Sequence, residues 1–499
     1  MSVDLFSLRE TLSTSSLVGA MPPPPPLMRA VFVVIGASGD LAKRKTFPAL
    51  FALLKHGFLC PESILLGFSR SKMDDADFSE HITSLINDGV SRFKSMCHYV
   101  SGDYNSKKSY ALLKDRILEL KSGSRFSEAH EFPFIFYLAI PPSVFLEVAR
   151  SIHHYIIPHL SSPSVPSNSS RFRLVVEKPF GHDLDSSNEL STSLAELFDE
   201  KQITFKETQG VEGRGGYFDS YGIIRDVMQN HLLQILSLIA MARFVSKIIL
   251  YHIKVAILRA IRPIDAQSVV LGQYVRSGSA IGYTEDPSVP DTSTTATFAA
   301  LVIYIDVPAW RGVPFILRCG KGLNEQKAEI RIQFKEVDEQ VPRNELVIRV
   351  QPREAVYLKL NIKNPGLTVP ISYSGATSSS AGSSPSLRDE ETIVAPPDPF
   401  ISSELDLTYG HKFSDSRIPD AYESLLLDLL HGEQGNFVRR DELDAAWKIF
   451  TPLLENVESR PYPPVPYAFG SRGPKEADDL IKSTGYKRDE GYTWHPPRL

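Results

Sequence analysis

The chain has 499 residues, 42% of them apolar and 23% charged, and a net charge of −5 at pH 7. This length exceeds what one hydrophobic core supports and predicts two domains. The sequence contains no run of about eighteen apolar residues, the length that a membrane-spanning helix needs. It also contains no block of basic residues, which excludes an electrostatic binding surface for nucleic acid.

The cysteines and the N-terminus indicate a cytoplasmic protein. Cys60, Cys97 and Cys319 lie far apart, which excludes a disulfide framework and a CxxC zinc site and is typical of a reducing compartment. We expect no metal site. Residues 1–28 have neither a basic start nor an apolar h-region, so a disordered N-terminal arm is predicted rather than a secretory signal. Ser and Thr at 11–16 leave a transit peptide open.

Short apolar runs alternate with amphipathic stretches from Arg29 onwards, which is the βαβ pattern. The apolar runs lie at 31–35, 63–68, 132–140 and 172–176, and helical patterns lie at 41–55 and 78–86. Residues 29–203 are therefore predicted to form an α/β, doubly wound, Rossmann-like dinucleotide-binding domain.

The pattern changes after about residue 200. One helical pattern covers 220–241, and β-rich runs with short connections follow at 297–305, 314–319, 328–334, 345–350 and 355–362. Such runs predict a large, mainly antiparallel sheet, so residues 204–499 are expected to form an α+β domain. Amphipathic helices near 421–430 and 441–454 are expected to cover part of that sheet. The stretch 372–397, rich in Ser, Pro and Gly, is predicted to be a mobile loop.

A glycine-containing turn follows the first strand pattern. Gly36-Ala37-Ser38-Gly39-Asp40-Leu41 opens a helix and would place backbone N–H groups near a pyrophosphate. A plain strand-to-helix turn is the alternative. The next strand pattern ends at 67–72 with Arg70 and Lys72, and no acidic residue is present there to accept bonds from a ribose 2′-hydroxyl. This arrangement favours NADP over NAD.

Longer motifs share one order with those of a known enzyme family. They are the runs 36–43, 176–181, 212–219, 222–234 and 318–321, with further matches at 343–357, 404–410 and 467–477. From about residue 29 to its C-terminus the chain resembles the glucose-6-phosphate dehydrogenase family. The resemblance implies NADP-dependent oxidation of glucose 6-phosphate at C1 to the 6-phosphogluconolactone, a step of glucose metabolism in the oxidative pentose phosphate pathway.

The resemblance also implies roles for individual residues. His231 would be the general base that takes the hydroxyl proton while hydride leaves for the nicotinamide C4. In the substrate site, Lys178 would reach both the substrate and the cofactor, Glu207 and Asp226 would bind sugar hydroxyl groups, and Lys321 and Gln351 would complete the sugar site. The cofactor would be bound by Gly36, Ala37, Ser38, Gly39, Asp40, Leu41, Ala42, Lys43, Arg70 and Lys178. Without the resemblance, His231 would be interpreted as a partly buried helical histidine and Lys178 as a solvent lysine at a strand end.

Members of the family often hold a second, structural NADP and form homodimers or homotetramers through the C-terminal sheet. The resemblance therefore assigns substrate binding and oligomerisation to the C-terminal domain. The residues that would contact the second nucleotide are Arg318, Lys327, Arg331, Arg349, Tyr357, Lys359, Asp406, Arg472 and Trp494.

The chain departs from the family between Ile203 and Thr204. There the family carries roughly forty more residues, including an Arg-Ile-Asp-His-Tyr-Leu-Gly-Lys-Glu run that supplies the carboxylate orienting the base and the His and Lys that hold the sugar phosphate. Asp226 is not expected to replace that carboxylate, because five α-helical steps of about 100° separate it from His231 by about 140°.

This departure keeps two further interpretations open. The chain would be a catalytically impaired NADP-binding homologue that acts as a binding or regulatory partner, or it would act on another hexose phosphate.

Overall fold

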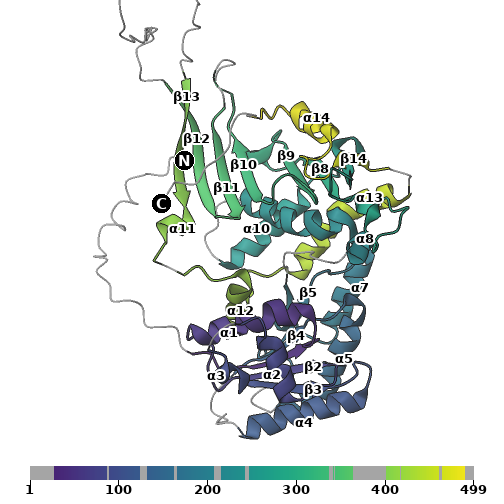
Figure 1. Ribbon diagram of the computed structural model, residues 1–499, viewed down its shortest axis with the longest axis vertical. Helices are drawn as coiled ribbons and strands as arrows, with labels where there is room; N and C mark the ends of the chain where they lie inside the picture. Colours follow the sequence, from purple (N-terminus) through teal and green to yellow (C-terminus); the bar gives the residue numbers. More distant parts are fainter. Residues whose placement is uncertain are drawn as a thin grey trace, which may run out of the picture. The chain divides into compact units, whose positions relative to one another are not determined.

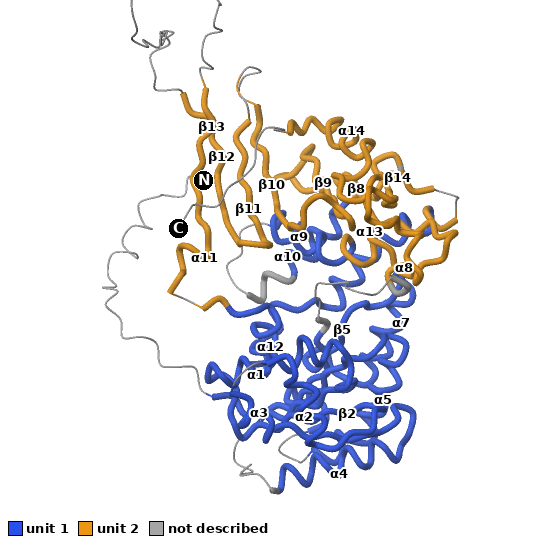
Figure 2. The backbone as a smooth tube through the Cα atoms, in the orientation of Figure 1, with its two compact units in different colours: residues 1–212, 229–261, 419–456 blue, residues 213–228, 262–418, 457–499 orange. Residues whose placement is uncertain are grey.

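The computed structural model describes residues 27–86, 89–123, 132–161, 166–206, 215–241, 247–336, 341, 343–363, 400–415, 417–459 and 463–488. Contacts group the chain into two compact units, coloured separately in Figure 2 and traced as ribbons in Figure 1. The first unit takes residues 1–212, 229–261 and 419–456, and the second takes 213–228, 262–418 and 457–499. The predicted loop 372–397 and all but Leu27 and Met28 of the predicted arm lie outside the described residues.

The first unit contains a six-stranded parallel sheet in the order β3-β2-β1-β4-β5-β6. The strands are β1 (Val31–Ile35), β2 (Ile64–Ser69), β3 (Cys97–Ser101), β4 (Phe134–Leu138), β5 (Phe172–Glu177) and β6 (Ile203–Lys206). β1, β2 and β4 are buried along their whole length, as expected for a sheet covered on both faces. The predicted doubly wound fold is confirmed, and its order reverses between β1 and β4, where such folds form a ligand crevice.

Helices cover this sheet in two groups. α1 (Phe47–Lys55), α2 (Asp75–Thr83) and α12 (Ala421–His431) share one buried cluster with residues of the strands. In the second group, α5 (Phe145–Tyr155) contacts both α4 (Lys107–Gly123) and α7 (Leu184–Ala195). The other helices of this unit are η1 (Ala42–Thr46), α3 (Ser91–Lys94), η2 (Pro142–Val144), α6 (Ile157–Leu160), η3 (Glu200–Gln202), α9 (Leu233–Ala240), α10 (Lys247–Arg259) and α13 (Arg440–Ser459).

The positions of α12 and α13 differ from the prediction. They were expected to cover the antiparallel sheet, but Leu426 and Leu429 of α12 are buried in the cluster that covers the parallel sheet. In α13, the Trp447 indole N–H donates to the backbone oxygen of Phe180, 3.1 Å away in the first unit. Amphipathic periodicity predicted both helices correctly but does not encode which sheet receives the apolar face.

A buried ion pair joins the helices α10 and α13. Lys254 Nζ lies 2.6 Å from Glu442 Oε1, and the two side chains are only 8% and 1% exposed. The amide of Gln234 in α9 donates to the same carboxylate at 2.7 Å. Three helices therefore meet at one charged group.

We expect Lys254→Met to lower the free energy of unfolding by about 3–5 kcal/mol, because it leaves the Glu442 carboxylate buried without its cation. Lys448→Met is the matched control on α13, since Lys448 pairs with Asp444 at 2.8 Å but is 60% exposed and should cost less than about 1 kcal/mol. Urea unfolding followed by tryptophan fluorescence measures both. Equal losses in the two variants would contradict the assigned role of the buried pair.

The second unit contains two four-stranded sheets, in the orders β10-β11-β12-β13 and β14-β7-β8-β9. All neighbouring strands are antiparallel except β14 and β7, so the predicted α+β class is confirmed. The strands are β7 (Val269–Val275), β8 (Phe298–Ile303), β9 (Phe315–Gly320), β10 (Ala328–Gln333), β11 (Glu345–Gln351), β12 (Ala355–Lys363), β13 (Phe400–Thr408) and β14 (Val465–Ala468). The helices are α8 (Gly215–Ile223), η5 (Ala266–Ser268), η6 (Tyr283–Glu285), η7 (Pro308–Trp310), α11 (Tyr409–Lys412) and α14 (Lys475–Ser483).

The sheet β10-β11-β12-β13 has two chemically different faces. Residues paired across neighbouring strands share a face, so the register Ile348↔Val356↔Leu407 and Leu346↔Leu358↔Leu405 defines an aliphatic face. Its members are Ile330, Ile332, Leu346, Ile348, Val356, Leu358, Leu360, Ile362, Ile401, Leu405 and Leu407. The opposite face carries mainly charged and polar side chains. None of the aliphatic members is fully buried, and Leu405 is 64% exposed.

Candidate functional site

The predicted glycine turn lies at the carboxyl end of β1, beside the point where the strand order reverses. Gly36 has φ of +85°, and a Cβ there would lie 2.2 Å from the backbone oxygen of Ala139, so only glycine fits. The Gly39 N–H closes the turn on the Gly36 oxygen at 2.9 Å. Close backbone approach at this turn is what a dinucleotide site requires.

The remaining predicted cofactor residues continue from this turn. Ala37 is buried, Ser38 is part-buried, and Asp40 and Leu41 begin the helix that passes into η1 with Ala42 and Lys43. The Asp40 carboxylate forms an exposed ion pair with Arg44 at 2.6 Å.

Arg70 follows β2 and is exposed, with its guanidinium carbon 5.6 Å from the centre of the Tyr104 ring. The narrow glycine turn and this exposed cation fit NADP, in which the 2′-phosphate needs a positive partner.

Lys178 and His231, 53 residues apart in sequence, are brought together in the first unit. Lys178 follows β5 directly, and its Nζ lies 2.6 Å from Nε2 of His231. An ammonium group has no acceptor, so Lys178 must be the donor and Nε2 must be unprotonated. The imidazole is then neutral with its proton on Nδ1, the tautomer in which Nε2 can accept a further proton.

His231 belongs to a π-helix rather than to an α-helix. The predicted pattern 220–241 forms α8, η4 (Ile224–Leu232) and α9, with a break at Gly222, whose φ is +68°. A π-helix bonds residue i to i+5, and Asp226 and His231 have this spacing. The expected angle of about 140° between the Asp226 and His231 side chains is therefore wrong for this segment, because that angle applies to an α-helix.

Asp226 and Lys321, both predicted to bind the sugar, form an ion pair in the second unit. Lys321 Nζ lies 3.2 Å from Asp226 Oδ2, and the Asp226 side chain is only 8% exposed. The Phe218 ring flanks the same ammonium at 5.4 Å. Gln351 ends β11 and is exposed. Glu207 lies outside the described residues.

Most residues predicted to hold a second nucleotide lie on the polar face of the sheet β10-β11-β12-β13. The strand register places Arg331, Arg349, Tyr357, Lys359 and Asp406 on that face. Arg331 pairs there with Glu345 at 2.7 Å. Burial alone would lower the pKa of Arg331, but the carboxylates of Glu329 and Glu345 outweigh burial and raise this pKa above its usual range.

The other predicted contacts to a second nucleotide lie beside this sheet in the same unit. Arg318 donates to the backbone oxygen of Arg472, and Arg472 pairs with Asp478 at 3.1 Å. Burial lowers the pKa of Arg318 to about 10. Lys327 pairs with Glu325 at 2.7 Å. Trp494 lies outside the described residues.

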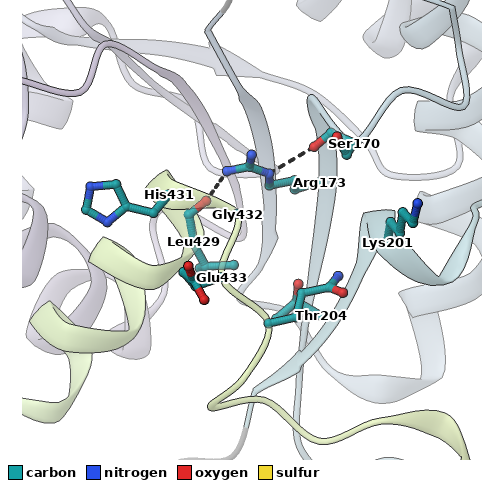
Figure 3. A pocket seen from close by; sticks show the side chains of 9 residues that line it. Ser170, Arg173, Lys201, Thr204, Leu429, His431, Gly432 and Glu433 are labelled. Atoms are coloured by element: carbon teal, nitrogen blue, oxygen red, sulfur yellow. Dashed lines mark hydrogen bonds between the residues drawn. The ribbon is translucent and has the colours of Figure 1, made fainter. Parts of the chain in front are cut away.

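A cavity of about 370 Å³ at the amino end of β5 contains none of the predicted site residues. Figure 3 shows the Arg173 guanidinium between Leu429 at the end of α12 and Ser170. Arg173 also donates to the oxygen of Leu430 at 3.1 Å, so it caps the C-terminal carbonyl groups of the helix. Burial lowers the pKa of Arg173 to about 10. We assign the cavity a structural role, because its half-buried cation, Arg173, binds the C-terminal carbonyl groups of α12.

Two family models match the chain. Residues 33–205 match "Glucose-6-phosphate dehydrogenase, NAD binding domain", and residues 194–495 match "Glucose-6-phosphate dehydrogenase, C-terminal domain". The glucose-6-phosphate 1-dehydrogenase of Dictyostelium discoideum is 43% identical over 93% of this chain and 95% of its own length. The cytoplasmic isoform of Solanum tuberosum is 41% identical, with 94% of each chain covered.

Solved structures agree with these relatives. A glucose-6-phosphate dehydrogenase in complex with glucose 6-phosphate superimposes with a TM-score of 0.79 and 37% identity, covering 94% of this chain and all of that one. The enzyme from Mycobacterium avium gives a TM-score of 0.71 at 25% identity, covering 95% of this chain and 99% of that chain.

The alignments with these relatives also contain gaps in this chain, at positions where the relative has a residue. The match with the Dictyostelium protein extends over 514 residues but includes only 93% of a 499-residue chain. On the order of fifty aligned positions therefore hold a residue in the relative and none here. The Solanum alignment, which extends over 522 residues, gives a similar difference.

Proposed function

Because the chain belongs to the glucose-6-phosphate dehydrogenase family, we propose that it oxidises glucose 6-phosphate at C1 to 6-phosphogluconolactone and reduces NADP. The observation that carries this proposal is the contact of 2.6 Å between Lys178 and His231 Nε2. It holds a neutral imidazole, with Nε2 as the acceptor, at the carboxyl end of β5.

The chemistry assigns one task to each group. Bound NADP supplies the hydride acceptor. His231 Nε2 accepts the proton of the C1 hydroxyl as the hydride departs, which prevents positive charge from accumulating on the sugar. Lys178, which donates to Nε2 in the absence of substrate, is placed to transfer that hydrogen bond to a sugar oxygen. Asp226 and Lys321 offer an acceptor and a donor for sugar hydroxyl groups.

A second candidate function is a catalytically impaired NADP-binding partner. It is motivated by the family resemblance, in which the base-orienting carboxylate and the phosphate ligands belong to a segment expected between Ile203 and Thr204. The roughly fifty unfilled alignment positions are enough to include a segment of that size. The glycine turn and Arg70 are intact in such a protein, so nucleotide binding would survive the loss of turnover.

One preparation separates these proposals. NADP binding is measured by calorimetry, and NADP reduction is followed by absorbance with glucose 6-phosphate and with other hexose 6-phosphates. Reduction that requires glucose 6-phosphate supports the oxidation proposal, and binding without reduction supports the impaired partner. Absence of both excludes both functions. If NADP is reduced faster with another hexose 6-phosphate, that sugar phosphate is the substrate instead of glucose 6-phosphate.

We further propose that the polar face of the sheet binds a second NADP through Arg331, Arg349, Lys359 and Tyr357. Cations on neighbouring strands of one face offer repeated charge-assisted donors to phosphate oxygens. We propose the cytoplasm as the location of the protein, because the Solanum relative is a cytoplasmic isoform and because the three cysteines are dispersed along the chain.

The aliphatic face of the same sheet supports homo-oligomers. A contiguous apolar surface of this kind marks an interaction site, and a second copy offers the same surface by symmetry. We expect Leu405→Asp to shift the protein towards monomer in sedimentation velocity, because it places a carboxylate in the proposed interface. Leu112→Asp, at a residue 51% exposed on α4, is the control. An unchanged distribution for Leu405→Asp contradicts this interface.

A further inference from the structure

Lys321, which belongs to the proposed substrate site, lies between two glycines directly after β9. Its neighbours are Gly320 and Gly322, and Gly322 has φ of +60°. Glycine restricts the backbone less than any other residue. The local sequence therefore does little to fix this lysine, and its position depends on contacts with other parts of the second unit.

Two buried residues bind both polar groups of the Lys321 backbone. The Lys321 N–H donates to the backbone oxygen of Thr297 at 2.9 Å, and the Tyr467 hydroxyl donates to the backbone oxygen of Lys321 at 2.7 Å. Thr297 directly precedes β8 and is fully buried, and Tyr467 lies in β14 and is only 4% exposed. The sheet β14-β7-β8-β9 thus supplies both contacts.

The hydroxyl groups of Tyr467 and Thr297 form a chain in which each proton is used once. The Tyr467 proton goes to the Lys321 carbonyl group, which can only accept. Tyr467 Oη therefore accepts from Thr297 Oγ1, 2.9 Å away, since the Gly272 oxygen at 3.5 Å is a poorer acceptor for Thr297. Thr297 Oγ1 accepts in turn from the Tyr274 backbone N–H at 3.0 Å. Burial raises the pKa of Tyr467, so its hydroxyl keeps the proton that it donates.

The segment before β8 holds both partners of the ion pair in the proposed substrate site. Thr297 accepts from Lys321, and the preceding residue, Ala296, accepts from the Ile223 N–H at 3.1 Å at the start of the π-helix that carries Asp226. The Lys321 ammonium lies 3.2 Å from the Asp226 carboxylate. A shift of the Lys321 backbone would therefore move the ammonium group relative to Asp226.

We propose that Tyr467 is a positioning residue for substrate binding, whose hydroxyl holds the Lys321 backbone so that the ammonium group meets the sugar beside Asp226. This inference rests on the proposed oxidation of glucose 6-phosphate. It extends that proposal to a buried tyrosine to which the family resemblance gave no role. When fewer molecules hold the lysine in place, the apparent affinity for the sugar falls by the same fraction.

The test is calorimetric titration of the purified chain with glucose 6-phosphate and, separately, with NADP. Tyr467→Phe keeps the ring and removes only the hydroxyl. We expect it to weaken glucose 6-phosphate binding about three- to fivefold, the population shift that one ordinary hydrogen bond supports, and to change NADP binding less than about twofold. Tyr486→Phe is the matched control, because its hydroxyl donates to Glu345 at 2.8 Å in the same unit, and it should leave glucose 6-phosphate binding unchanged.

A double variant separates the positioning of Lys321 from a general effect on stability. Lys321→Gln removes the charge and keeps a hydrogen-bond donor, and it should weaken glucose 6-phosphate binding about tenfold, because charge-assisted bonds are the stronger ones. Since Tyr467 acts through Lys321, adding Tyr467→Phe to Lys321→Gln should weaken binding by less than about 1.5-fold more.

The outcomes distinguish this inference from the proposed function. Wild-type protein that does not bind glucose 6-phosphate overturns the proposed oxidation and the inference together. If wild-type protein binds it, an unchanged affinity in Tyr467→Phe overturns the inference alone. An equal loss from Tyr467→Phe with Lys321 and with Gln at position 321 also overturns it, because Tyr467 would then only stabilise the sheet.

Discussion

Insertion of the family's forty-residue segment between Ile203 and Thr204 is expected to raise kcat/KM for glucose 6-phosphate at least about 100-fold. By resemblance, this segment adds a His and a Lys that bind the sugar phosphate. Each charge-assisted bond is worth about 1.5–3 kcal/mol, so two of them account for about 100-fold or more. It also adds the carboxylate that orients the base, which recovers part of the roughly 10² to 10⁴-fold that a positioned base contributes. Initial rates of NADP reduction measure the change.

The structure shows a strand at the junction where the resemblance places that segment. β6 crosses the junction, since Ile203 pairs with Leu174 and Thr204 pairs with Val175. The edge position of the parallel sheet is thus filled by residues from both sides of the junction. In the longer protein the first inserted residues are expected to continue the strand after Ile203, so that Thr204 and the rest of β6 no longer occupy this edge position.

The controls for this insertion test chemistry rather than length. A Gly/Ser segment of equal length restores the spacing without ligands and should leave the rate low. A family segment with its signature Asp, His and Lys replaced by Asn, Gln and Met should behave in the same way. Equal activity of these inserts and the intact segment would contradict the assigned roles. An unchanged rate with the intact segment would favour the impaired NADP-binding partner.

The sequence predicted the parts of the site that local patterns encode. The unbroken apolar run of β1 followed by Gly36 and Gly39 identifies a strand, a tight turn and a helix, and Lys178 follows the last apolar residues of β5. A short unbroken apolar run that is rich in β-branched residues and ends at a glycine turn is typical of a buried parallel strand. The family resemblance placed Lys178 and His231 in one site but did not predict their direct contact, and no local pattern relates residues 53 positions apart.

Other features escaped prediction for identifiable physical reasons. Hydrophobic periodicity indicates a helix but does not distinguish i→i+4 from i→i+5 bonds, so the π-helix at Asp226 and His231 was missed. The contacts of the Ser69 hydroxyl with Ser38 and with Tyr99 join side chains about thirty residues apart in sequence. Tyr99 belongs to none of the motifs that indicated the cofactor, and only the register of β2 and β3 brings it next to Ser69.

His231→Asn in the protein with the inserted segment is expected to lower kcat by about 10²- to 10⁴-fold, the usual contribution of a positioned general base. Asparagine keeps polarity and much of the side-chain volume but offers no basic nitrogen in place of Nε2. KM for glucose 6-phosphate should change little, because the lost interaction arises mainly in the transition state. Steady-state kinetics with varied glucose 6-phosphate at saturating NADP separate the two constants.

The contact with Lys178 makes this prediction specific to the base. In His231→Asn the amide oxygen can accept from the Lys178 ammonium, so a lysine that still binds substrate preserves KM while the proton acceptor is lost. His252→Asn, at an exposed residue of α10, is the matched control and should keep the full rate. A full rate in His231→Asn would contradict the assignment of His231 as the general base. A rise in KM with an unchanged kcat would instead assign His231 to substrate binding, with its neutral Nε2 serving to hold Lys178 rather than to take the proton.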